Sequence, residues 1–296
     1  MTTAMAQERI MESLSPGGEF AFTGEDFHKI ADILHGASGI ALSESKATLV
    51  YSRLAKRLRA LGLESFRDYC ALVADNANVD ERQKMIAALT TNVTAFFREA
   101  HHFDHLKTKV LPPLLAKAKQ GGRVRLWSAA CSTGMEPYSM GLTVLSLMPD
   151  APDYDIRILA TDIDPNVVAE GKAGVYSDTV LQPVPEAMKS RWMEPVADAP
   201  EKRWRMGEAL QRLISFRELN LIGMWPMQGK FDVIFCRNVV IYFEEGTQAR
   251  IWSRFAVTIA PGGRLYIGHS ERLNGPATSQ FESDGLTTYR FVGGAA

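Results

Sequence analysis

A run of small residues, Ser128-Ala-Ala-Cys-Ser-Thr-Gly134, lies between an apolar segment and a stretch with helical periodicity. Small side chains let a ligand approach the backbone, and the N-terminus of the following helix attracts anions. The run lacks the Gly-x-Gly-x-x-Gly pattern that binds pyrophosphate, and Glu136 stands where a phosphate would otherwise lie. A carboxylate there suits a cationic ammonium group, which favours S-adenosylmethionine over NAD as the ligand. The alternative is that Glu136 only caps the helix.

A second acidic group follows the apolar segment 156–160, where the sequence reads Thr161-Asp-Ile-Asp164. An acid at this place in nucleotide-binding α/β folds accepts hydrogen bonds from ribose hydroxyls, so we interpret Asp162 as the ribose ligand. Asp164 precedes Pro165, a pair typical of the start of a helix. We therefore expect Asp164 to cap the next helix.

Polar residues also interrupt a third apolar stretch, where Cys236, Arg237 and Asn238 stand together. A strand that only built the core would not need them. Tyr242, four residues beyond Asn238, is either a packed aromatic with its hydroxyl at the surface or a group near the reacting atoms.

A mixed segment, Thr90-Thr-Asn-Val-Thr-Ala-Phe-Phe-Arg98, precedes these elements and by itself indicates a helix boundary with a hydrophobic anchor. His101, His102 and His105 follow it, and two of them lie four apart on a helical face. No matching Glu or third-ligand pattern accompanies them, so we interpret them as helix residues and predict no metal site.

The residues after Gly121 alternate between strand-like and helix-like apolar patterns, as in a parallel α/β sheet. Ligands bind at the carboxyl ends of the strands in such sheets, where the polar residues described above lie. About 40 residues separate Gly171 from the third strand, too many for an ordinary connection of about 2–6 residues, so we expect a small folded insertion. The expected strands are 124–130, 156–160, 213–216, 231–236, 264–268 and 287–292, and the expected helices include 136–148 and 247–260.

The N-terminal part of the chain has a different pattern. Residues 1–19 end in a Pro-Gly-Gly run and show no sustained period, which indicates a loosely ordered tail. From Thr23 to Leu89 the pattern is helical, and it begins with a helix-start signature, Thr-x-Glu-Asp. One of the expected helices places four apolar residues on one face: Val50, Leu54, Leu58 and Leu61.

Composition excludes several classes of protein. The 296 residues carry a net charge of −1, so the overall balance does not call for nucleic acid or an anionic membrane as a partner. The three cysteines are far apart and show no Cys-x-x-Cys spacing, which argues against a zinc knuckle or a disulfide framework. With 46% hydrophobic residues and no pattern of a signal peptide or membrane span, we expect a two-domain protein of the cytoplasm.

Six sequence blocks extend along nearly the whole chain, and in this order they resemble the CheR family, methyltransferases that esterify glutamate side chains of bacterial chemotaxis receptors. The blocks are Asn92-x-Thr-x-Phe-Phe-Arg98, Trp127-Ser-Ala-Ala-Cys-Ser-Thr-Gly-x-Glu-Pro-Tyr-Ser139, Thr161-Asp-Ile-Asp164, Asn220-Leu221, Phe235-Cys-Arg-Asn-x-x-Ile-Tyr-Phe243 and Gly268-His-Ser-Glu271.

The resemblance implies an α/β protein with a helical receptor-docking domain at residues 20–91 and a catalytic domain at 92–296. The catalytic domain would be a Rossmann-like class I methyltransferase domain that binds S-adenosylmethionine and releases S-adenosylhomocysteine. Its mostly parallel sheet would have seven strands, the last antiparallel, with a small β-subdomain inserted at about 173–212. The stretch 193–203 contains no glycine, so we do not predict that a receptor peptide tethers to this subdomain.

The resemblance also implies roles for individual residues. Arg98 and Tyr242 would lie nearest the chemistry. A glutamate carboxylate has a reference pKa of about 4.3 and is ionised at neutral pH, so methyl transfer to it needs no general base. We expect Arg98 to orient a carboxylate of the substrate or of the cofactor, and the Tyr242 hydroxyl to steer the acceptor. The implied cofactor-binding residues are Asn92, Thr94, Arg98, Glu136, Asp162, Asn220, Leu221, Arg237 and Asn238.

Basic residues occupy the flank and back of the helix whose apolar face is described above, and they are either a solvated surface or a docking site. The resemblance implies a receptor whose methylated glutamates lie on an acidic helical bundle. A basic surface on the enzyme would therefore dock the cytoplasmic domain of this chemoreceptor. We expect the protein to act as a monomer, with no nucleic-acid partner and no insertion into the membrane. The implied docking residues are Lys46, Arg53, Lys56, Arg57 and Arg59.

Two other functions compete with this interpretation. A nucleic-acid methyltransferase would carry an Asn/Asp-Pro-Pro-aromatic motif after the fourth strand, where this chain has Arg237-Asn238-Val-Val. A scaffold that binds the cofactor without turnover is the second, and the presence of Arg98 and Tyr242 argues against it.

Overall fold

The computed structural model describes residues 18–197 and 200–293. These residues form two compact units, one made of the described residues before Asn92 together with Tyr242–Glu244, the other of the described residues in Asn92–Ile241 and from Glu245 to Gly293. The predicted tail lies outside the described residues except for its last two positions. Within the described ranges, no helix is long and apolar enough to cross a membrane.

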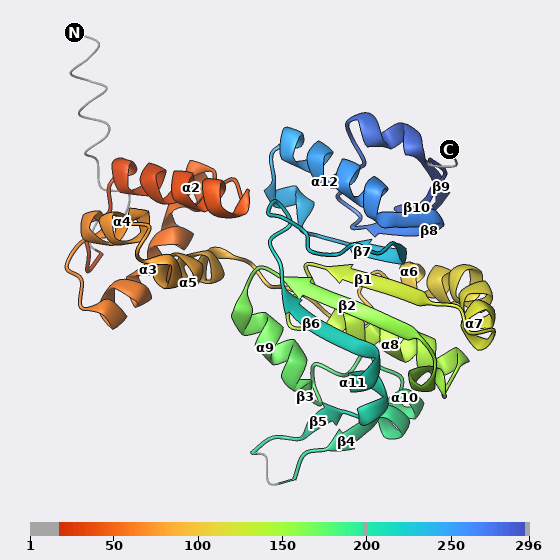
Figure 1. Cartoon of the computed structure of the whole chain (residues 1–296). Coiled ribbons are helices and arrows are strands. Elements are labelled where there is room, and N and C mark those ends of the chain that lie inside the picture. Colours follow the sequence, from red (N-terminus) through yellow and green to blue (C-terminus); the bar gives the residue numbers. More distant parts are fainter. Residues whose placement is uncertain (1–17, 198–199, 294–296) are drawn as a thin grey trace. The chain divides into compact units, whose positions relative to one another are not determined.

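The helical unit contains α2 (Gly24–Ser38), α3 (Ala47–Leu61), α4 (Phe66–Ala74) and α5 (Val79–Leu89), as Figure 1 shows. Helix α2 begins as predicted: the hydroxyl oxygen of Thr23 accepts a hydrogen bond from the Asp26 amide at 3.2 Å. The Asp26 carboxylate accepts one from the Thr23 amide at 3.0 Å. The two bonds form a capping box, which satisfies amides that have no partner within the helix.

Three of the four apolar residues predicted to form the inner face of α3 are fully buried, namely Val50, Leu54 and Leu58. The prediction is wrong for Leu61, which is 40% exposed. Leu61 is the last residue of α3, because Gly62 takes a left-handed conformation (φ 66°) and ends the helix. The packed face therefore stops one turn earlier.

The second unit is built on a seven-stranded sheet. Its strands, in spatial order, are β6 (Ile214–Glu218), β2 (Ile156–Asp162), β1 (Val124–Ala129), β7 (Phe231–Cys236), β8 (Ile259–Ile267), β10 (Thr288–Phe291) and β9 (Phe281–Gly285). The first five are parallel, and β10 runs antiparallel to both of its neighbours. The predicted fold class, a mostly parallel sheet with an antiparallel last strand, is confirmed.

The C-terminal part of the sheet differs from the prediction in two places. Strand β8 begins at Ile259, inside the segment predicted as helix, and runs through Pro261-Gly-Gly. Its register against β7 shifts between Phe231 and Val233, and a bulge of this kind accommodates Pro and Gly in a strand. Strand β9, Phe-Glu-Ser-Asp-Gly, has no apolar alternation from which a strand could be predicted.

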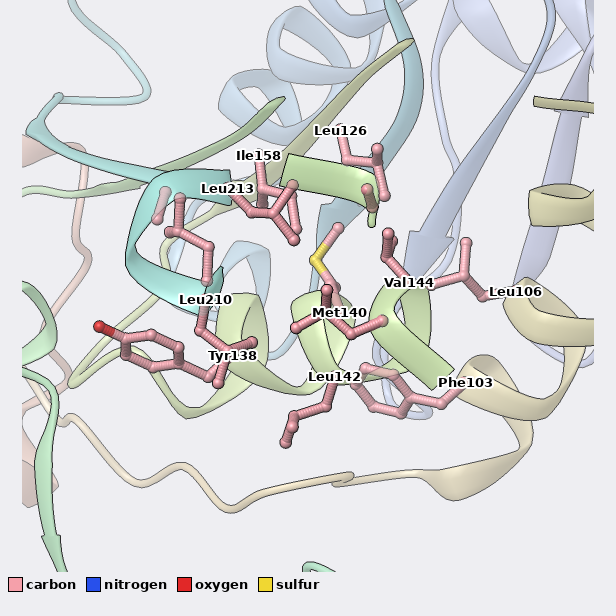
Figure 2. Close-up of a cluster of buried hydrophobic side chains, with 14 of the residues drawn as sticks. Phe103, Leu106, Leu126, Tyr138, Met140, Leu142, Val144, Ile158, Leu210 and Leu213 are labelled. Carbon is pink, nitrogen blue, oxygen red and sulfur yellow. The ribbon is translucent and has the colours of Figure 1, made fainter. Parts of the chain in front are cut away.

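Helices cover both faces of this sheet (Figure 1). Adjacent residues of β1 face opposite layers, because side chains alternate along a strand. Leu126 lies beside Met140 of α8 (Met135–Leu147), as Figure 2 shows. Trp127 instead packs on Phe255 of α12 (Glu245–Thr258), with ring centroids 5.3 Å apart. The other helical segments of the unit include α6 (Ala100–His105), a π-helical turn (Leu106–Val110), α7 (Leu111–Lys119) and α9 (Pro165–Ala173).

Helix α8 has no solvent-facing stripe, because every residue from Glu136 to Leu145 is buried. Strands β1 and β2 cover one side, and α6, the π-helical turn, α10 (Glu186–Trp192) and α11 (Glu208–Leu213) cover others. Burial on all sides fixes the position of its first turn, and Glu136 lies in that turn.

A second, three-stranded sheet lies between α9 and β6 and corresponds to the predicted insertion. Its strands are β3 (Val175–Ser177), β5 (Arg203–Met206) and β4 (Met193–Pro195), in that spatial order and antiparallel. It is joined to the loop after β1 through Tyr176, whose hydroxyl donates a hydrogen bond to the Thr133 carbonyl at 2.6 Å.

Candidate active site

The strand order reverses at β1, which has β2 on one side and β7 on the other. Ala129, at the end of β1, pairs with Thr161 of β2 and with Cys236 of β7. The segments that follow these three strands therefore leave the sheet at the same edge. In an open parallel sheet, this edge at the point of reversal is where ligands bind.

The loop after β1 has an unusual backbone. Ala130 (φ 66°), Ser132 (φ 50°) and Gly134 (φ 89°) all take left-handed conformations, which are strained for the two residues that are not glycine. At Gly134 a side chain has no room, because a Cβ atom would lie 2.9 Å from the Cα atom of Gly171. The Ser132 hydroxyl donates a hydrogen bond to the Asn92 carbonyl at 2.9 Å and so ties the loop to the segment before α6.

Asp162 holds this loop and the start of α9 together. One carboxylate oxygen accepts a hydrogen bond from the Ser132 amide at 2.8 Å, and the other accepts one from the Asp164 amide at 3.1 Å. Asp162 is 7% exposed, and burial raises its pKa, although the bonds from the backbone amides oppose the rise. Asp164 caps α9 as predicted, since its carboxylate accepts a hydrogen bond from the Asn166 amide at 2.9 Å. It also accepts one from the Asn92 side-chain amide at 2.9 Å.

Glu136 bridges β1 and the segment after β7. Its two oxygens accept hydrogen bonds from the Ser128 hydroxyl at 2.7 Å and from Nη1 of Arg237 at 3.0 Å. Both partners lie outside α8, so Glu136 does more than cap the helix. The side chain is buried, which raises the pKa of its carboxyl, while the charge of Arg237 acts in the opposite direction.

Arg237 is buried and connects three segments. Besides Glu136, it contacts Glu99, with 3.3 Å between Nη2 and the nearer carboxylate oxygen, and it donates a hydrogen bond to the Arg98 carbonyl. Its guanidinium lies over the rings of Phe103 and Phe235, 5.9 Å and 5.8 Å from their centroids. Two carboxylates therefore balance one buried cation.

Arg98 lies in a backbone segment held from both sides. Its neighbours Phe97 (φ 53°) and Glu99 (φ 58°) are left-handed, and its own Nη1 donates a hydrogen bond to the Val93 carbonyl at 2.9 Å. Burial alone would raise the pKa of Glu99, but the hydrogen bond from His269 and the charge of Arg237 outweigh it and lower that pKa to about 2. A charged Glu99 thus anchors the segment that presents Arg98.

The other predicted cofactor-binding residues lie in the loops around the same edge of the sheet. The side-chain oxygen of Asn220, just after β6, accepts a hydrogen bond from the Ile222 amide at 3.1 Å. Leu221 is buried, and Thr94 is half-buried between Asn92 and Arg98. Asn238 follows Arg237 in a left-handed conformation (φ 58°).

Glu271 is a residue of this edge to which we assign no role from the sequence. Its buried carboxylate accepts hydrogen bonds from backbone amides of the segment after β7. The Gly-His-Ser-Glu block contains it, but nothing in the local pattern indicates which atoms it contacts.

The predicted helical histidines pack into the fold. His102 is fully buried and lies 2.9 Å from the Thr287 hydroxyl through Nε2, and His105 lies 2.9 Å from the Tyr266 hydroxyl through Nδ1. Glu99, His101 and His102 bring one potential metal ligand each within 4.8 Å of one another. Glu99, however, is already engaged by a guanidinium and by His269. The absence of a metal site remains a prediction.

Tyr242 and the basic residues belong to the helical unit. The Tyr242 carbonyl accepts a hydrogen bond from the Ala41 amide at 2.9 Å. Lys46 and Lys56 are exposed, and Arg59 forms an exposed ion pair with Glu19.

Two of the basic residues also stabilise the helical unit itself. Arg57 binds the buried carboxylate of Glu81 through two hydrogen bonds of 2.9 Å and 2.6 Å. Arg53 donates to the Thr90 carbonyl, at 2.6 Å, beyond the C-terminus of α5. These guanidinium groups are therefore partly committed to contacts within the fold.

The donor and acceptor groups at this edge fit a ligand that carries an ammonium group and a ribose. A carboxylate offers about four acceptor positions. Glu136 uses two within the protein, and Asp162 interacts with the backbone amides of Ser132, Ile163 and Asp164. Each can still accept a hydrogen bond from a ligand. The buried hydroxyl of Thr133, in the loop after β1, has no partner among the described residues. Two carboxylates at these positions would repel a phosphate.

Comparison with known proteins agrees with this geometry. Residues 92–290 match the family described as CheR methyltransferase, SAM binding domain, and residues 25–90 match CheR methyltransferase, all-alpha domain. A probable chemotaxis protein methyltransferase of Rhizobium etli is 54% identical over 260 residues, which cover 88% of this chain and 97% of the relative. The chemotaxis protein methyltransferase of Escherichia coli is 38% identical over 272 residues, covering 91% of each chain.

A third relative, chemotaxis protein methyltransferase 2 of Pseudomonas aeruginosa, is 40% identical over 273 residues, covering 92% of this chain and 94% of the relative. The two family matches together span both units, and the three relatives are matched over nearly their whole length. The chain is a member of the CheR methyltransferase family, with S-adenosylmethionine as its cofactor.

Proposed function

We propose that the protein transfers the methyl group of S-adenosylmethionine to glutamate side chains of bacterial chemoreceptors, forming methyl esters that serve chemotactic adaptation. The observation that carries the proposal is the buried bridge from Ser128 through Glu136 to Arg237 at the reversal of strand order. This bridge holds a buried carboxylate beside the segment that bears Arg98, which supports the assignment of Glu136 to the ammonium group. The named function of the relatives supports the choice of substrate.

The proposed cofactor residues form two groups. Some would bind the ligand directly through a carboxylate, and others would hold these carboxylates or line the site. Glu136 would accept hydrogen bonds from the ammonium group, and Asp162 from the ribose hydroxyls. Asn92 and Arg237 would act partly through the carboxylates they bind, since both have partners within the fold. The remaining contacts would come from Thr94, Asn220, Leu221 and Asn238.

The reaction asks little acid–base chemistry of the protein. When bound, the cofactor would supply a methyl group on a positively charged sulfur, and the acceptor carboxylate oxygen would bond to the methyl carbon as the carbon–sulfur bond breaks, with S-adenosylhomocysteine as the leaving group. An ionised glutamate is already a nucleophile at neutral pH. The protein must align it and remove its water, and alignment alone accounts for about 7–11 kcal/mol in well-oriented reactions. Arg98 would orient a carboxylate, and the Tyr242 hydroxyl would steer the acceptor.

We further propose that the helical unit docks the cytoplasmic domain of the receptor. We also propose that the enzyme is a monomer and that it works in the cytoplasm. The exposed ammonium groups of Lys46 and Lys56 suit an acidic helical surface. Arg53, Arg57 and Arg59 lie on the same helix, α3, although each also has a partner within the unit.

A radiolabelled methyl-transfer assay tests the function. The purified protein would be incubated with labelled S-adenosylmethionine and a receptor cytoplasmic fragment, and the label released as methanol by mild base would be counted. We expect base-labile label on the fragment and none on DNA or RNA. Label on nucleic acid would support the rival methyltransferase. Cofactor binding without any transfer would support the scaffold.

A further inference from the structure

The carboxylate of Glu271, 2% exposed, accepts four hydrogen bonds from backbone amides. One oxygen accepts from Asn238 at 2.9 Å and from Gly268 at 2.5 Å. The other accepts from Val239 and Val240, both at 2.9 Å. All of these residues belong to the second unit, which contains the seven-stranded sheet.

Three of the four amides lie directly after β7, where the strand no longer supplies partners. Unpaired amides in a buried place are costly, and the carboxylate satisfies them together. It also fixes a turn that begins with Asn238 in a left-handed conformation (φ 58°). The corner is tightly packed: a Cβ atom on Gly268 would lie 2.5 Å from Nδ2 of Asn238 and 2.9 Å from an oxygen of Glu271.

The residue before this turn is Arg237, which binds Glu136 and Glu99. A shift of the turn would move Arg237 and Asn238 together. Because Arg237 binds Glu136, the shift would also disturb the carboxylate assigned to the ammonium group. We propose that Glu271 is a positioning residue that holds the Arg237–Asn238 segment in the geometry that binds S-adenosylmethionine. The proposal rests on the cofactor assignment made above and adds a residue that acts through the backbone.

The chemistry of the position requires a carboxylate. An ionised carboxyl group only accepts, and each of its oxygens here accepts two amides. Glutamine has the same shape, but its NH₂ group would face two N–H donors. Glu271→Gln therefore removes acceptors without removing volume. The matched control is Glu282→Gln on β9, which breaks an exposed ion pair with Arg290 on β10.

The experiment measures the affinity for S-adenosylhomocysteine by titration calorimetry and amide hydrogen exchange at Asn238, Val239 and Val240 without cofactor. We expect Glu271→Gln to weaken binding about tenfold or more and to speed exchange at these amides, with the KM for a receptor fragment unchanged. Glu282→Gln should behave like the wild type in all three measurements.

Gly268→Ala serves as a second variant, because its methyl group would displace the same corner, including the Glu271 carboxylate, while residue 271 stays a glutamate. It should also weaken binding, at a temperature where circular dichroism shows each variant folded. Wild-type affinity in Glu271→Gln, with or without faster exchange, would overturn the proposal. Wild-type protein that binds the product but never methylates a receptor would refute the proposed function and leave the role of Glu271 intact. Wild-type protein that fails to bind the product would overturn both.

Discussion

Nη1 of Arg237 lies 3.0 Å from a carboxylate oxygen of Glu136, and this contact joins the end of β7 to the first turn of α8. The two residues are separated by 101 positions in sequence, yet both lie where the strand order reverses. A pair this deeply buried is sensitive to the loss of either partner, because the remaining charge has no solvent to stabilise it.

We therefore expect Arg237→Met to lower the free energy of unfolding by about 3–5 kcal/mol, since both Glu136 and Glu99 lose their cation. Binding of S-adenosylhomocysteine should weaken as well. Urea unfolding followed by circular dichroism measures the first effect and calorimetry the second. The control, Arg290→Met, loses only an exposed pair with Glu282, so a change within about 1 kcal/mol is expected. Equal effects of the two substitutions would contradict the inference that Arg237 stabilises the fold by balancing the buried charges of Glu136 and Glu99.

The pH dependence of stability should depend on His102. Burial first, and then the charge of Arg237, lower its pKa from 6.5 to about 3. Between these values the unfolded chain binds a proton that the folded chain does not, so the free energy of unfolding falls as the pH is lowered from 6.5 towards 3. His102→Gln removes this contribution. The fall should become shallower by up to about 1.4 kcal/mol per pH unit.

Urea titrations at several pH values would measure this slope. His28→Gln, at an exposed position of α2, is the control for the loss of a histidine outside the core. If His102→Gln and the wild type gave the same slope, the pKa of His102 would have to be the same in the folded and the unfolded protein.

Part of the candidate site is predictable from the sequence because strands of a parallel sheet end in polar residues. Asp162 and Arg237 each follow an apolar run, and parallel pairing brings such ends to one edge whatever lies between them. Asp164 was predictable for a local reason, since the residue before a helical proline is commonly its cap. Local patterns and sheet geometry together therefore predict which residues meet.

What the sequence could not predict are pairings between distant buried groups and strained backbone. The bonds of Glu271 to Asn238 and of Arg57 to Glu81 join residues 33 and 24 positions apart, with no periodic signal between them. The left-handed conformations of Ala130 and Ser132 were also unpredictable, because neither residue favours them; the surrounding hydrogen bonds impose them.

Arg98 should be needed for catalysis more than for folding. Its guanidinium bonds only the Val93 carbonyl among the described residues, so its loss costs little stability. We expect Arg98→Ala to lower kcat/KM for methyl transfer about 100-fold, the size of effect that misplacement of a reacting group produces. The control is Arg157→Ala, near the start of β2 and at the end of that strand away from Asp162, which should retain wild-type activity. If Arg98→Ala transferred methyl groups at the wild-type rate, the Arg98 guanidinium would have no role in catalysis.

Receptor docking is best tested at the exposed lysines, because Arg57→Glu would place a second negative charge beside buried Glu81 and unfold the helical unit. The double substitution Lys46→Glu/Lys56→Glu avoids this. We expect it to raise the KM for a receptor fragment about tenfold, as two weak exposed charge pairs would give.

The effect of this double substitution should shrink at high salt, because exposed charges are screened, and the affinity for S-adenosylhomocysteine should not change. Lys84→Glu, exposed on α5 and outside the predicted docking set, is the control within the same unit. If Lys84→Glu raised the KM as much as the double variant does, the effect would come from net charge. If neither variant changed the KM, the receptor would have to approach the enzyme through another surface.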